Sequence, residues 1–162
     1  MIDVKRRLFL LVASAIACLP MPGTATERQV QSLDGTWDII FDQDNGGRDA
    51  GWHLNDAFSM HPSIRQILVP SCWELLEKDY EGVAFYRRTF KVPAGWKGKV
   101  IRLQFDAVNF LSEVWINDQA VGVHEGGFTP FEFRVDGLLN HGAENTLILR
   151  VVGPILLQDK QV

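Results

Sequence analysis

The feature that most limits the possible folds of this chain is a series of short segments in which apolar and polar residues alternate. In residues 100–106, Ile101, Leu103 and Phe105 are apolar, and a charged or amide side chain follows each of them. An alternation with a period of two places the apolar side chains on one face of a β-strand. Short strands of this kind, separated by turn residues, are typical of an antiparallel sandwich or barrel.

The same pattern recurs along the chain. Further strands are predicted at residues 37–41, 67–69, 85–92, 113–117, 119–124, 131–135 and 146–152. The last of these is apolar on both faces apart from Arg150, as expected for a central strand. Asn117 and Asp118 tolerate the left-handed backbone conformation, so they predict the turn of a hairpin. No long stretch after residue 25 has the spacing of a helix, and the predicted fold class is all-β, an antiparallel β-sandwich.

Arg88 breaks the pattern of its segment, because it falls on the same face as Tyr86, Phe90 and Val92. An unpaired charge in an apolar layer is costly. We therefore expect the Arg88 side chain to reach a sheet edge or a carboxylate.

The N-terminal segment has the organisation of a signal peptide. Three basic residues at positions 5–7 precede a short apolar run at 8–19, and helix-breaking and small residues follow up to Ala25. The run is shorter than the roughly 20 residues that span a bilayer. Residues 1–25 are predicted to be a signal peptide cleaved after Ala25, which leaves residues 26–162 as the mature domain, periplasmic or extracellular. The alternative is a lipoprotein signal in which Cys18, preceded by the small Ala17, carries the lipid.

Composition excludes several functions. A length of 162 residues accommodates one domain. The formal charge of −4 becomes more negative once the basic N-terminal segment is removed, so a nucleic-acid partner is not expected. Cys72 is the only cysteine after residue 25, and the histidines have no metal-ligand spacing. We expect no disulfide, no metal and no cofactor.

Several longer motifs occur in a characteristic order. They are LDGTW at 33–37, VPSCWE at 69–74, YRRTFKVP at 86–93, FDAV at 105–108, VWIND at 114–118, VGVHEGGFTPF at 121–131 and NTL at 145–147. Together they resemble the N-terminal sugar-binding domain of glycoside hydrolase family 2, which includes β-galactosidases, β-glucuronidases and β-mannosidases. The resemblance covers about residues 32–155.

The resemblance implies a jelly-roll sandwich that precedes an immunoglobulin-like domain and a catalytic (β/α)₈ barrel. The catalytic glutamates of the family lie on the barrel, which alone takes about 250 residues. The chain by itself is therefore expected not to be catalytic. Family members also continue past the strand at 146–152 into closing strands, so the sandwich is expected to be incomplete at its C-terminal end.

Aromatic residues in loops are the best candidates for binding carbohydrate, because their rings stack on sugar C–H faces while neighbouring carboxylates bind the hydroxyls. The candidates are Trp73, Glu74, Tyr80, Glu125 and Phe128. Trp73 and Phe128 have a structural alternative, in which each anchors its loop on the core.

Other residues have structural interpretations. Glu74, Glu77, Asp79 and Glu81 form an acidic cluster that we interpret as solvated charge rather than a catalytic pair. His124-Glu125 lacks the second histidine of a zinc motif, since position 128 is Phe. Cys72 is interpreted as a small packed residue. Trp37 and Trp115 are interpreted as packing residues, with Trp115 partly exposed.

These patterns leave three hypotheses open. The chain is the carbohydrate-binding and scaffold domain of an exported family 2 glycosidase; or it is a free-standing carbohydrate-binding module for β-linked glycosides; or it is an inert remnant of a truncated gene.

Overall fold

The computed structural model describes residues 28–158, and the folded unit begins at Ser32. The predicted signal peptide, its cleavage site and Cys18 lie outside the described residues. The strands are β1 (Gly35–Asp42), β2 (Arg65–Val69), β3 (Val83–Lys91), β4 (Arg102–Phe105), β5 (Leu111–Ile116), β6 (Gln119–Glu125), β7 (Phe131–Arg134) and β8 (Glu144–Val152). The helices are α1 (Asn55–Ser59), η1 (Trp73–Leu75), η2 (Ala94–Trp96), η3 (Asp136–Leu138) and α2 (Pro154–Gln158). Within the described range no helix is long and apolar enough to cross a membrane.

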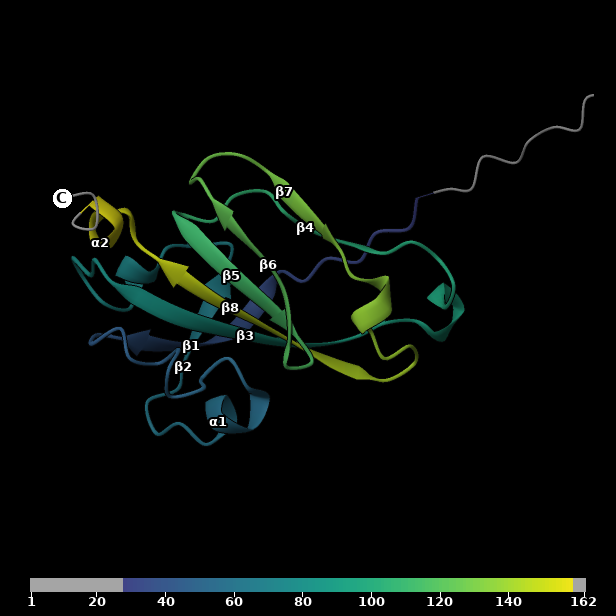
Figure 1. Cartoon of the computed structure of the whole chain (residues 1–162), viewed down its shortest axis with the longest axis horizontal. Helices are drawn as coiled ribbons and strands as arrows, with labels where there is room; N and C mark the ends of the chain where they lie inside the picture. The colour runs from purple at the N-terminus through teal and green to yellow at the C-terminus, as the bar shows by residue number, and fades with distance from the viewer. Residues whose placement is uncertain (1–27, 159–162) are drawn as a thin grey trace, which may run out of the picture. The chain divides into compact units, whose positions relative to one another are not determined.

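The strands form one large sheet and one small sheet (Figure 1). The six-stranded sheet has the order β2-β1-β3-β8-β5-β6, and the two-stranded sheet pairs β4 with β7. All of these pairings are antiparallel. The all-β prediction is confirmed, and β8 takes the central position that its two apolar faces predicted.

The inner face of the large sheet packs against β4 and β7. Leu147 and Leu149 of β8 point to this face and join Leu103 of β4 in one buried cluster. Phe105 and Phe131 stack at 4.9 Å between ring centroids across the small sheet. The alternation in residues 100–106 therefore predicted correctly which side chains face the core.

The opposite face of the large sheet is also covered. The segment between β1 and β2, which carries α1, lies on the other side of this sheet from β4 and β7 (Figure 1). Phe58 of α1 is fully buried against Phe85 and Ile148. Trp115, which was predicted to be partly exposed, is only 7% exposed and stacks on His53 at 5.0 Å. That prediction was wrong because the polar neighbours on its strand face, Glu113 and Asn117, suggested solvent, whereas the segment between β1 and β2 covers this face.

The predicted hairpin joins β5 and β6. Asn117 and Asp118 have φ values of 49° and 65°, as the left-handed two-residue turn requires. The side chain of Asn117 also donates to the Leu138 carbonyl at 2.8 Å and accepts from the Thr146 amide at 3.0 Å. The turn thus ties the hairpin to the segments on either side of it.

Arg88 reaches neither of the groups expected from the sequence. Its guanidinium donates to the carbonyl oxygens of Thr36 and Asp34, on either side of Gly35. Gly35 has a φ of +119°, a conformation that L-residues rarely adopt. Backbone carbonyls at the start of β1 therefore take the place of the expected carboxylate.

Candidate functional site

Trp73 and Tyr80 belong to the segment between β2 and β3, and both pack inward. Trp73 is 8% exposed, and its ring meets the Tyr80 ring edge-on at 5.6 Å. The Tyr80 hydroxyl donates to the Val83 carbonyl at 2.7 Å and accepts from the Val83 amide at 3.1 Å. Burial raises the pKa of Tyr80. These contacts support the anchoring interpretation of Trp73, and they direct the two rings toward the core rather than toward a sugar.

The acidic residues of the same segment lie on the surface. Glu77 forms an ion pair with Arg65 at 2.9 Å, and Asp79 lies 3.9 Å from the ammonium group of Lys78. Glu74, in η1, is exposed. The arrangement matches a solvated acidic surface.

Cys72 is exposed, so the prediction of a packed residue was wrong. It directly precedes η1, whose first residue, Trp73, turns inward and takes the buried position. Beneath this turn lies Tyr86 of β3. The pKa of Tyr86 is strongly raised, chiefly by burial and further by the nearby Glu74 and Cys72.

The segment that joins β6 to β7 has a packed backbone and one protruding ring. Gly127 is buried, and a Cβ there would lie 2.6 Å from Oδ1 of Asn109. Phe128 is 90% exposed, which contradicts the interpretation of this residue as an anchor. Glu125 is also exposed, whereas the His124 ring stacks on Phe131 at 3.9 Å. Phe128 is therefore the aromatic candidate whose ring is exposed to solvent, whereas the rings of Trp73 and Tyr80 pack inward.

The two segments lie at the same end of the sandwich. Glu125 pairs with Leu111, Leu111 pairs with Val152, and Val152 pairs with Val83 across the large sheet. Tyr80 binds the backbone of Val83, at the end of this row. The structure therefore brings the predicted candidates to one end of the molecule, although only some of them face the solvent.

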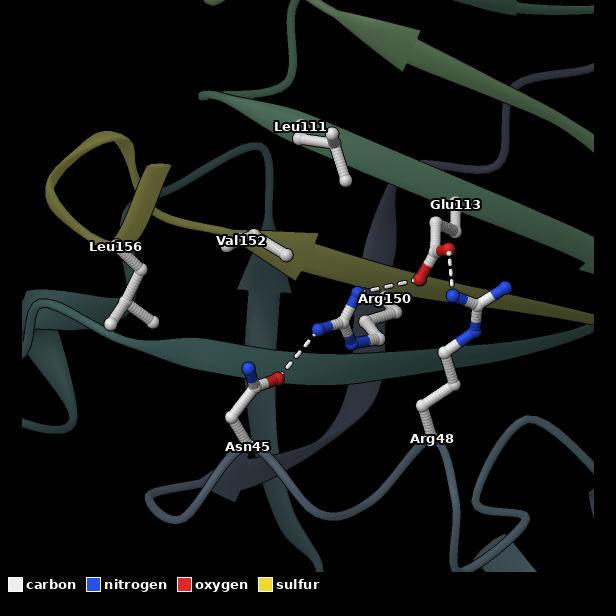
Figure 2. A pocket seen from close by; sticks show the side chains of 7 residues that line it. All are labelled: Asn45, Arg48, Leu111, Glu113, Arg150, Val152 and Leu156. Carbon is white, nitrogen blue, oxygen red and sulfur yellow. Dashed lines mark hydrogen bonds and ion pairs between the residues drawn. The ribbon is translucent and has the colours of Figure 1, made fainter. Parts of the chain in front are cut away.

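A charged cluster that the sequence did not reveal lies near the same end, on the outer face of the large sheet. Glu113 of β5 and Arg150 of β8 are opposite each other in the register and form a buried ion pair at 2.6 Å. Arg48 reaches the other carboxylate oxygen of Glu113 at 3.2 Å, and Arg150 donates to Oδ1 of Asn45 at 2.6 Å (Figure 2). The 37 positions that separate Glu113 from Arg150 hid the pair. The only signal in the sequence was a single charge within each of two largely apolar stretches, Glu113 in residues 111–116 and Arg150 in residues 145–152.

Asp42 at the end of β1 shapes the loop that brings Asn45 and Arg48 to this cluster. Its two carboxylate oxygens accept hydrogen bonds from the amides of Gly46 and Gly47 at 3.0 and 2.9 Å. A Cβ at Gly47 would lie 2.3 Å from the Trp52 ring, so glycine is required at this position. The loop is therefore held in one conformation by a buried carboxylate.

The cluster lines a pocket of about 220 Å³. Leu111, Val152 and Leu156 form its apolar part, and Asn45, Arg48, Glu113 and Arg150 form its polar part. Over residues 28–158 the structure contains no group of three or more His, Cys, Asp or Glu side chains that could hold a metal ion.

Comparison with known proteins gives a consistent result. The profile of the family described as "Glycosyl hydrolases family 2, sugar binding domain" matches residues 30–160. The chain is similar to a β-glucuronidase of Paenibacillus borealis, with 30% identity over 80% of this chain and 22% of that protein. It is also similar to a β-galactosidase of Thermoanaerobacter pseudethanolicus, with 31% identity over 73% of this chain and 14% of that protein.

Solved structures show the same similarity. A β-glucuronidase of Lactobacillus rhamnosus matches with a TM-score of 0.69 and 32% identity, over 76% of this chain and 21% of that one. A β-glucuronidase of Ruminococcus gnavus in complex with uronic deoxynojirimycin matches with a TM-score of 0.70 and 30% identity, over 76% of this chain and 21% of that one. The chain thus spans about a fifth of the length of these solved relatives.

Proposed function

Because this chain belongs to glycoside hydrolase family 2, as its sugar-binding domain, we propose that it serves a β-glycosidase by binding carbohydrate and supporting a separate catalytic domain. The observation that carries the proposal is the match over residues 30–160, which corresponds to about a fifth of each solved relative. In the intact enzyme the partners would be an immunoglobulin-like domain and a catalytic barrel, as the resemblance implies.

The buried carboxylates of the described residues are engaged in structural contacts. A retaining glycosidase needs two carboxyl groups about 5–5.5 Å apart, one as acid/base and one as nucleophile. The two buried carboxylates in the described range are Asp42 and Glu113. Asp42 is committed to backbone amides and Glu113 to two arginines. Both therefore have structural roles.

Phe128 and Glu125 are the residues we propose for contact with carbohydrate. Phe128 presents an exposed ring, and Glu125 lies three residues before it with an exposed carboxylate. Stacking of a sugar ring on Phe128, with hydroxyls bound by Glu125, is the chemistry expected of such a pair. Glu74 remains a further candidate on the surface of η1, whereas Trp73 and Tyr80 contribute by fixing their segment.

Phe128→Ala tests this proposal, with Val123→Ala as the matched control. Both remove an exposed apolar side chain from the same part of the fold, and neither leaves a cavity. We expect Phe128→Ala to lose retention on an immobilised β-glycoside column and Val123→Ala to keep it. Equal retention of the two variants would show that carbohydrate is not bound at Phe128.

The free-standing module remains the second candidate function, and the exposure of Phe128 is the observation that favours it. The DNA downstream of the coding region of this chain distinguishes the two candidates. Barrel-coding sequence in frame, or after one frameshift, supports the glycosidase domain. Its absence, combined with glycoside binding by the chain alone, supports the module. An inert remnant would show neither.

The chain is proposed to be exported, because its first 25 residues have the charge, length and small residues of a signal peptide. Mass spectrometry of the protein from the host envelope should give an N-terminus at Thr26. A mass increase corresponding to acyl chains at Cys18, lost in Cys18→Ala, would establish the lipoprotein alternative. If the native protein and Cys18→Ala both keep the mass of the unprocessed chain, export through this segment is rejected.

A further inference from the structure

The pocket on the outer face of the large sheet has an unusual excess of hydrogen-bond donors. An arginine side chain carries five N–H groups. Arg150 uses one on Glu113 and one on Asn45, and its Nε is buried with no hydrogen-bond partner in the described part of the chain. The amide nitrogen of Asn45 adds two more donors, since the oxygen of that amide is the atom that faces Arg150.

The acceptor capacity of the pocket is small by comparison. Glu113 is its one carboxylate; one of its oxygens accepts a hydrogen bond from Arg150, and the other forms an ion pair with Arg48. Two guanidinium groups against one carboxylate leave a formal charge of +1 on the polar wall. An acceptor-rich anion is the ligand that complements such a wall, because Arg binds carboxylates through paired N–H donors.

The rest of the pocket is aliphatic. Leu111, Val152 and Leu156 close the side away from Arg48 (Figure 2). A wall of this kind packs against C–H groups and provides no hydrogen bonds. The ligand should therefore carry its charge at one end and a compact hydrocarbon or sugar-ring face at the other.

We propose that this pocket binds a small carboxylate with one six-membered ring, such as a single sugar acid. The volume of about 220 Å³ accommodates one ring. The carboxylate lies against Arg48, Arg150 and the Asn45 amide, and the ring packs on the three aliphatic residues. Neither Phe128 nor Glu125 lines this pocket, although Glu125 lies opposite Leu111 in the register, and the site does not require a catalytic domain.

The experiment is a titration of the full chain with small ligands, followed through its methyl groups by NMR at neutral pH. The probes are sodium D-glucuronate, D-glucose and sodium cyclohexanecarboxylate, at constant ionic strength. For a ligand of this size we expect a dissociation constant of the order of 1 mM. The methyl signals of Leu111, Val152 and Leu156 should shift with glucuronate, whereas those of Leu103 and Val135 in the inner core should not.

The probes separate the possible ligands. Shifts with glucuronate but not with glucose identify the carboxylate as the recognised group. Equal shifts with cyclohexanecarboxylate show that any small ring carboxylate fits, and stronger shifts with glucuronate assign the site to sugar acids. If none of the three probes shifts the methyl signals of the pocket residues, the charged cluster only holds the loop between β1 and β2 in place, and the proposal is wrong.

Two variants test the contacts. Arg48→Gln removes a guanidinium whose side chain is 60% exposed, so the fold should tolerate it; we expect affinity for glucuronate to fall about 5- to 10-fold. Arg102→Gln is the matched control, because Arg102 is a similarly exposed arginine paired with Glu132 on the other sheet. Asn45→Asp keeps the oxygen that faces Arg150 but adds a negative charge, and it should lower affinity about 10-fold or more. Unchanged affinity in both Arg48→Gln and Asn45→Asp would overturn the proposal.

Discussion

The two faces of the six-stranded sheet are covered in different ways. On the outer face, Phe58 of the segment between β1 and β2 packs on Phe85 of β3, and both are fully buried. The ion pair of Glu113 and Arg150 lies at the end of this layer. On the inner face, β4, β7 and the segment of η1 cover the sheet, and large side chains such as Phe90, Phe105 and Tyr86 are only partly buried. Six strands thus face two across the inner core.

The two layers differ in how completely they bury their large aromatic side chains. A large sheet normally buries its apolar face against a layer of similar extent. The outer layer buries Phe58 and Phe85 fully and Trp52 partly, whereas Tyr86, Phe90 and Phe105 of the inner layer are all partly buried. We therefore expect the outer face to contribute more than the inner face to the free energy of unfolding of the described unit.

The largest difference between the faces should appear on removal of a phenylalanine. Phe58→Ala empties a fully buried site, so we expect a loss of about 4 kcal/mol in the free energy of unfolding. Phe105→Ala removes a partly buried ring and should cost about half as much. Urea titration followed by circular dichroism measures both. Equal losses for the two variants would show that the two faces are equally well packed.

The next largest difference should be in how much the ion pairs on the two sheets contribute to the free energy of unfolding. Glu113→Gln leaves Arg150 buried without its counter-charge, for a cost of about 3 kcal/mol. Glu132→Gln on the small sheet breaks an exposed pair with Arg102 and should cost under about 1 kcal/mol. The same urea titration applies to both. If Glu113→Gln lowers the free energy of unfolding as little as Glu132→Gln, the ion pair of Glu113 and Arg150 does not stabilise the outer layer.

A close contact within the inner layer provides a smaller effect. A Cβ at Gly122 would lie 2.5 Å from a ring carbon of Phe133, so Gly122→Ala forces β6 and β7 apart. We expect a destabilisation of about 2 kcal/mol. Gly137→Ala is the control, since nothing lies within 4 Å of a Cβ there, and it should be close to neutral. If Gly122→Ala leaves the free energy of unfolding unchanged, the small sheet can shift away from β6 without loss of stability.

The smallest effect concerns pH. The chain has two tyrosines, Tyr80 and Tyr86, both on the inner face, and burial raises the pKa of each above 10. The folded state therefore holds these protons more tightly than the unfolded state. This contribution to stability is fully present below about pH 10 and is lost as the pH rises through the folded pKa values. Absorbance at 295 nm should show little phenolate at about pH 10, the ordinary pKa of tyrosine. Half-ionised tyrosines there would mean that the inner face is open to water.

The strands could be predicted because their information is local. Alternation in residues 100–106 and the Asn117-Asp118 turn specify the backbone within a few residues. The cover on the outer face could not be predicted in this way. Its apolar contacts come from residues such as Trp52 and Phe58, which come after a polar stretch without a recognisable period.

The candidate site could be predicted only in part for a related reason. Exposure of a loop aromatic depends on which neighbour takes the buried position, and no pattern in the sequence distinguishes Trp73 from Phe128 in this respect. The anchoring interpretation therefore covers both residues, although Phe128 is 90% exposed. Glu113 and Arg150 meet through the register of β5 and β8, and sequence separation conceals such pairs.

We propose that this chain binds carbohydrate without hydrolysing it. The most direct measurement is an NMR time course of p-nitrophenyl β-D-glucuronide, and of the corresponding galactoside, mixed with the purified chain. We predict saturation transfer from the protein to the ring protons of the glycoside, with no release of nitrophenol above the buffer rate. Nitrophenol released in proportion to the concentration of the chain would show that the chain hydrolyses the glycoside and that the proposal is wrong.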